Sequence, residues 1–156
     1  MTAPAWFNNK VKLNEGDVSL FQYIKLVQLS DHEEYMILED NTGVRHLVPY
    51  KYYLNYGFEP GMELTCKVDR INCTGRVFLE PAHPIYTEGA SYEFRIISVE
   101  DHIQMNSDKI TVTIADVFNN CIRCEIHPGT SDFHADEKII LKVKGFKKGK
   151  PVLVAE

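Results

Sequence analysis

Four cysteines are the residues of this chain whose type and spacing most directly suggest chemistry. Cys121 and Cys124 form a Cys-x-x-Cys pair, and Cys66 and Cys73 could supply the two further ligands that a zinc site needs. The pair falls inside a predicted strand, however, where residues three apart point to opposite faces unless a bulge intervenes. We therefore predict no metal site and no cofactor.

The sequence contains no glycine-rich phosphate loop, no nucleophile elbow and no His-Glu-x-x-His motif. Its carboxylates fall mainly in predicted turns and at strand edges, where a solvated charge is the ordinary role. We predict that the protein is not an enzyme and has no catalytic residues.

The charge is acidic overall but unevenly spread. A formal net charge of −5 and a pI near 5.7 argue against a strong, non-specific nucleic-acid binder, because such binding relies on neutralising phosphates. From residue 138 to residue 150, however, there are six lysines and no acid. Two roles remain open for this cluster: binding a phosphate backbone, or protecting a sheet edge from aggregation. The candidate phosphate contacts are Lys142, Lys144, Lys147, Lys148 and Lys150.

The composition is that of a globular protein, with 44% hydrophobic and 25% charged residues. No apolar run is long enough to span a bilayer, and residues 1–12 do not resemble a signal peptide. We expect a cytoplasmic protein with reduced thiols and no membrane association.

The elements that position these residues are mostly strands. Period-2 alternation between turn signals predicts five strands in each half of the chain. In the first half they cover residues 17–28, 35–39, 44–48, 63–69 and 77–79, with a short helix over 49–57 after the third strand. In the second half they cover residues 92–99, 110–115, 121–126, 139–143 and 152–154.

The two halves repeat one plan. The alternation of Leu64, Cys66 and Val68 recurs at 139, 141 and 143, and the first strand of each half changes phase, after Tyr23 and after Ile96. Such a phase change predicts a bulge that lets a small barrel close. A five-strand unit of about 70 residues with one bent strand is the plan of the OB-fold. The predicted fold is therefore all-β, with two tandem five-stranded OB-fold barrels in domains 1–86 and 87–156.

Five aromatic residues cluster in and after the predicted helix. They could stack on nucleic-acid bases or could plug one end of the barrel with their apolar rings. The sequence leaves both roles open for Tyr50, Tyr52, Tyr53, Tyr56 and Phe58.

The first repeat also resembles a known family. Glycine precedes the first strand at Gly16, the third strand reads Gly43-Val44-Arg45-His46, and Gly61 to Val68 is followed by Gly75-Arg76-Val77-Phe78-Leu79. These motifs, over residues 15–81, resemble the S-one-type RNA-binding domain, an OB-fold repeat of the largest small-subunit ribosomal protein. The second repeat carries only the fold pattern.

The resemblance implies that RNA lies across the outer face of strands two and three. It implies contacts from the histidine of strand three, a neighbouring aromatic residue and basic residues of the last strands; by position these are Tyr35, His46 and Arg76, with Lys67 or Arg70 nearby. From the residues alone, His46 could equally be a half-buried structural histidine.

We therefore predict a non-enzymatic module that binds single-stranded RNA through an aromatic and histidine face and basic loops. The alternative is a tandem OB-fold that serves as a protein-interaction or scaffold module, with a protein partner in place of RNA.

Overall fold

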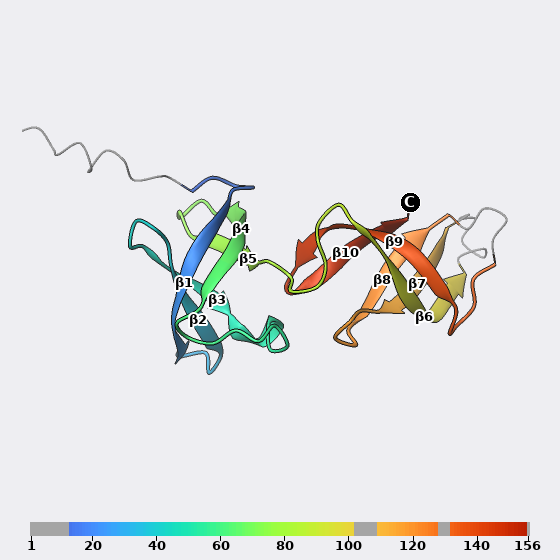
Figure 1. The fold of residues 1–156 in the computed structure, drawn as a ribbon, viewed down its shortest axis with the longest axis horizontal. Coiled ribbons are helices and arrows are strands. Elements are labelled where there is room, and N and C mark those ends of the chain that lie inside the picture. Colours follow the sequence, from blue (N-terminus) through green and yellow to red (C-terminus); the bar gives the residue numbers. More distant parts are fainter. Residues whose placement is uncertain (1–12, 102–108, 128–131, 156) are drawn as a thin grey trace, which may run out of the picture. The chain divides into compact units, whose positions relative to one another are not determined.

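The computed structural model describes residues 13–101, 109–127 and 132–155, and these residues form two compact units (Figure 1). The units are Met1–Ala82 and His83–Glu156, so the division falls four residues before the predicted boundary. The described residues form strands, turns and a single 3-10 turn, with no α-helix. None of them belongs to a helix long and apolar enough to cross a membrane.

The first unit is one antiparallel sheet of five strands in the order β3-β2-β1-β4-β5. Its inward side chains, among them Phe21, Met36 and Val68, are almost completely buried. They alternate with exposed polar residues, which is the pattern of a sheet with one buried face. The strands are β1 (Val18–Gln28), β2 (Glu34–Glu39), β3 (Arg45–Pro49), β4 (Glu63–Ile71) and β5 (Val77–Pro81).

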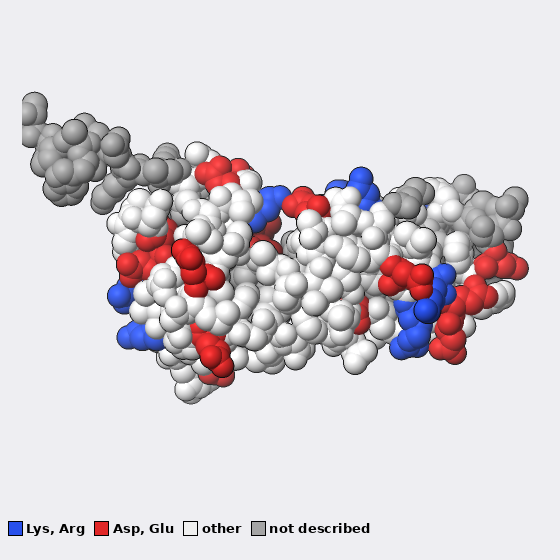
Figure 2. All heavy atoms as spheres, in the orientation of Figure 1, with Lys and Arg blue, Asp and Glu red and all other residues white. Residues whose placement is uncertain are grey.

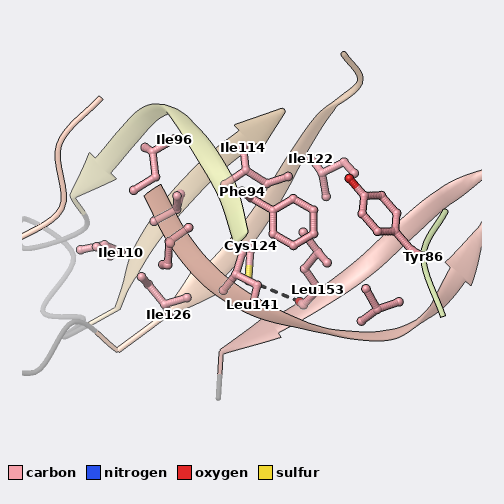
Figure 3. Close-up of a cluster of buried hydrophobic side chains, with 13 residues drawn as sticks. Tyr86, Phe94, Ile96, Ile110, Ile114, Ile122, Cys124, Ile126, Leu141 and Leu153 are labelled. Atoms are coloured by element: carbon pink, nitrogen blue, oxygen red, sulfur yellow. Dashed lines mark hydrogen bonds between the residues drawn. The ribbon is translucent and has the colours of Figure 1, made fainter. Parts of the chain in front are cut away.

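The second unit repeats this plan, with the strand order β10-β9-β6-β7-β8. Its end strands β8 and β10 contact each other, and the Cys124 thiol donates to the Leu153 carbonyl at 3.3 Å, so the sheet is a nearly closed barrel. Aliphatic side chains and Phe94 fill the interior (Figure 3). The strands are β6 (Ser91–Asp101), β7 (Ile110–Ala115), β8 (Cys121–Ile126), β9 (Lys138–Lys147) and β10 (Lys150–Ala155).

The predicted bulges are confirmed. The register of β1 against β2 shifts between Tyr23 and Lys25, and that of β6 against β7 shifts between Ile96 and Ser98. The first half of each long strand pairs with the fourth strand of its unit, and the second half pairs with the second strand. The bulge lets one strand serve both partners while the sheet curls.

The short helix predicted over residues 49–57 is reduced to one 3-10 turn, Tyr50–Tyr52. Tyr53 N bonds to Tyr50 O and Tyr56 N bonds to Tyr53 O, so the segment makes i→i+3 turns. Tyr53 and Tyr56 are 3% and 9% exposed and pack edge to face at 5.2 Å. The buried Tyr53 hydroxyl also donates to the Glu80 carboxylate of β5. These two tyrosines therefore pack into the first unit.

Candidate nucleic-acid interface

The outer side of β1, β2 and β3 in the first unit carries a half-buried apolar surface. In the strand register, Tyr35 stands opposite Val27 and Pro49, and Ile37 stands opposite Lys25 and Leu47. Residues that face each other across strands share one side of the sheet. Their neighbours along β2, Met36 and Leu38, are completely buried, so this set lies on the outer side. We call this surface the β2–β3 face: Lys25, Val27, Tyr35, Ile37, Leu47 and Pro49.

The corresponding side of the second unit has a different chemistry. Thr113 stands opposite Ser98 and Arg123, in the place that Ile37 holds between Lys25 and Leu47. Arg123 also forms an ion pair with Glu100 at 2.9 Å. At these outer positions the second unit therefore has the polar residues Ser98, Thr113 and Arg123, where the first unit has Lys25, Ile37 and Leu47.

Tyr35 is held in place by an acidic loop. Its hydroxyl donates to Asp31 Oδ2 at 2.7 Å, and Asp31 Oδ1 accepts the Glu33 amide at 2.9 Å. The hydrogen bond to Asp31 raises the pKa of Tyr35, while the nearby positive charge of Arg76 acts in the opposite direction. The predicted contacts Tyr35 and Arg76 therefore lie in the same neighbourhood.

Arg70 and Arg76 both lie on the ring of Phe78. The guanidinium carbons of Arg70 and Arg76 are 4.3 and 4.9 Å from the ring centroid, and Arg70 stands directly opposite Phe78 in the β4–β5 ladder. The structure thus brings these two predicted residues together around an aromatic ring that the sequence reasoning did not select. Phe78 could have been found from its position opposite Arg70 across the two strands. That pairing depends on a bulge in β4 that the sequence analysis did not predict.

His46, predicted as an RNA contact on the sheet surface, has a mostly buried side chain. Its side chain is 8% exposed, its ring packs edge to face on Phe21 at 5.9 Å, and its Nε2 lies 2.9 Å from Asp40 Oδ2. The other oxygen of Asp40 accepts hydrogen bonds from the turn that joins β2 and β3. Burial alone would raise the pKa of Asp40, but these hydrogen bonds and that of His46 hold it below its usual value.

The remaining predicted contacts lie on exposed strand positions and on a hairpin. Lys67 is exposed on β4, opposite Val18 and Glu80. The five lysines predicted as phosphate contacts, Lys142, Lys144, Lys147, Lys148 and Lys150, are all exposed on β9, β10 and the turn between them. In that turn, Lys148 and Gly149 both have positive φ, 52° and 77°, which is the backbone of a tight two-residue hairpin.

Basic side chains do not form one broad patch on the face drawn in Figure 2. Lys and Arg atoms gather there in small groups, several of which border Asp or Glu atoms. A shallow depression of about 380 Å³ in the first unit includes three carboxylates, Glu39, Asp40 and Glu63, among its lining residues. Such a surface does not attract phosphate, so it lies outside the candidate interface.

The cysteines form no metal centre in the part of the chain that the structure describes, where no group of three or more potential ligands gathers. Cys121 is exposed and Cys124 is buried, as expected for residues three apart in one strand. Burial, together with the Glu80 carboxylate, raises the pKa of the Cys66 thiol to about 12.

Comparisons with known proteins leave the family open. No model of a known protein family matches the chain, and no curated protein matches it significantly. Among solved structures it is similar to a multidomain protein with nucleic acid binding domains from Streptococcus pneumoniae TIGR4, at 11% identity and a TM-score of 0.32. The match covers 88% of this chain and 50% of that one, so the chain spans half the length of that protein. A likeness this weak establishes neither a family nor a function.

Proposed function

We propose that this protein is a tandem OB-fold module of the S-one type that binds single-stranded RNA mainly through its first unit. The observation that carries the proposal is the β2–β3 face, which is apolar and aromatic and has Arg76 close to Tyr35. Unpaired bases stack on such surfaces while neighbouring cations contact the phosphates. The strand order and the bulged first strand of each unit support the OB-fold assignment.

The exposed lysines of the β9–β10 hairpin add a second basic surface, which would contact phosphates without reading sequence. Because the whole chain is acidic, we expect binding that is modest and depends strongly on salt. Nothing in this mechanism needs a metal, a cofactor or a catalytic group, and we propose a non-enzymatic, cytoplasmic protein.

The test is fluorescence anisotropy with short single-stranded RNA, single-stranded DNA and duplex RNA at low and moderate salt. Loss of a stacking ring costs about 1–3 kcal/mol per base, so Tyr35→Ala is expected to weaken RNA binding about 5- to 150-fold. The matched control is Thr113→Ala at an outward position of the second sheet, which should leave affinity within twofold. Equal effects of the two variants would remove the β2–β3 face from the interface.

A protein-interaction module is the second candidate. Val18 and Leu20 of β1 are 64% and 52% exposed, and exposed apolar side chains on a sheet are suited to a protein partner. This candidate predicts no binding to any oligonucleotide even at low salt.

A further inference from the structure

Two of the five arginines are distinguished by what they contact. All five lie in the described part of the chain, and three of them form ion pairs: Arg45 with Glu39 at 3.1 Å, Arg95 with Asp136 at 3.3 Å, and Arg123 with Glu100 at 2.9 Å. Within the same described residues, Arg70 and Arg76 form no ion pair and lie instead on Phe78. Two guanidinium charges therefore gather at one ring, and neither is ion-paired with a carboxylate of the described residues.

A bulge in β4 creates this arrangement. Val68 and Leu79 face each other and are both buried, and simple alternation would turn Arg70 inward as well. The register shift between Val68 and Arg70 inserts Asp69 as an extra residue, so that Arg70 stands outward opposite Phe78.

Arg76 reaches the same ring from the other side of the hairpin turn. Its amide donates to Asn72 Oδ1 at 2.8 Å, and Asn72 N bonds to the Arg76 carbonyl at 3.0 Å. Gly75, at a φ of 85°, supplies the positive φ of this turn. The backbone at the base of the Arg76 side chain is thus fixed.

The physical consequence is preorganisation. A cation–π contact uses the face of the ring and leaves the N–H donors of the guanidinium available. It also orders two long side chains before any ligand arrives, which lowers the entropy lost on binding. Guanidinium groups bind phosphate strongly because their fork of donors matches its oxygens.

We propose that Arg70 and Arg76 form a phosphate-contact element and that Phe78 is its positioning residue. The proposal rests on the function proposed above, to which it adds the positioning role of Phe78 and phosphate as the group that both arginines contact. The second unit lacks the element. By register, Gly145 and Val152 stand where Arg70 and Phe78 stand in the first unit, after a matching shift in the β9–β10 ladder.

The first experiment needs no RNA. Five arginines give five Nε–Hε signals in a nitrogen–proton NMR spectrum, which single Arg→Gln variants assign. On titration with inorganic tripolyphosphate, the signals of Arg70 and Arg76 are expected to shift and saturate together, while that of the ion-paired Arg95 stays. Phe78→Leu should weaken the apparent affinity several-fold, and Phe78→Tyr, which keeps a ring, should restore it. Equal small shifts at all five arginines, or a Phe78→Leu protein that behaves like wild type with an unchanged amide spectrum, would overturn the proposal.

The second experiment separates this inference from the proposed function. For a single strand, each neutralised phosphate contributes about 0.7 to the slope of log K against log salt. Replacing both Arg70 and Arg76 with Gln should therefore flatten that slope by about 1.4, and Arg95→Gln should not change it. If wild type binds RNA and the double variant keeps its slope, the phosphate element fails and the proposed function stands. If no RNA binds but tripolyphosphate shifts Arg70 and Arg76, the proposed function fails and the anion site stands.

Discussion

Replacing His46 should destabilise the first unit. His46→Ala removes an edge-to-face ring contact with Phe21, worth about 0.5–1.5 kcal/mol. It also removes a hydrogen bond to the Asp40 carboxylate, which is 6% exposed, and such bonds to charged groups contribute about 1.5–3 kcal/mol. Asp40 keeps its hydrogen bonds from the turn. We therefore expect the free energy of unfolding of this unit to fall by about 2–4 kcal/mol.

Hydrogen exchange measures this effect unit by unit, which a single melting curve of a two-unit protein does not. The amides of Met36 and Val48, which face each other in the β2–β3 ladder, should exchange about 30- to 900-fold faster in the variant. Amides of β6 to β9 should not change.

The second repeat offers a matched variant. Ile122 holds the position of His46, and Asn120 Nδ2 donates to Asp116 Oδ2 at 2.9 Å in place of a histidine. His46→Ile should therefore recover the packing contribution but not the hydrogen bond, and it should lie between wild type and His46→Ala. Unchanged exchange rates in His46→Ala, combined with a large loss of RNA affinity, would refute this reasoning. That result would show that His46 contacts the ligand and does not stabilise the first unit.

Three further predictions concern buried groups. Thiol reagents at mildly alkaline pH should label the exposed Cys73 and Cys121 quickly in the native protein, and all four cysteines after unfolding. Cys66 and Cys124 are buried, and the pKa of the Cys66 thiol is about 12, so a third fast-reacting thiol in the native protein would contradict this prediction. Tyr53→Phe removes the hydroxyl that donates to the buried Glu80 carboxylate, so the free energy of unfolding of the first unit, measured by hydrogen exchange, should fall by about 1–3 kcal/mol. An effect no larger than that of Tyr50→Phe would contradict this prediction. The pKa of Asp40 is lower in the folded than in the unfolded chain, so its contribution is present above the unfolded value of about 3.9 and is lost as pH falls through the folded value. Acid titration should therefore destabilise wild type more steeply than Asp40→Asn, and parallel curves would show that this carboxylate has no such role.

Much of the fold was predictable because alternation is a strong signal in half-buried strands. The burial of β8 follows it residue by residue, and the bulges in β1 and β6 were visible as a break in phase after Tyr23 and Ile96. The prediction of a helix over residues 49–57 was wrong. The tyrosines of this segment are spaced for a helix, but Tyr53 and Tyr56 pack inward from i→i+3 turns.

The candidate site was only partly readable. Tyr35, Arg70 and Arg76 were selected by position, but the bulge at Asp69 looks in sequence like the end of a strand, so the Phe78 contact was hidden. The burial of His46 did leave a signal. His46 lies two residues before the buried Val48, so both side chains point to the same side of the strand. Asp40, its hydrogen-bond partner, stands at the start of the tight turn before it.

The central claim is that RNA binds to the β2–β3 face of the first unit. The most direct measurement is amide chemical-shift mapping of the full chain during titration with single-stranded RNA. We predict the largest, saturable shifts at Lys25, Tyr35, Ile37 and Leu47, extending to Arg76, with smaller shifts in the β9–β10 hairpin. Shifts confined to the second unit, or no shifts at low salt, would contradict the claim.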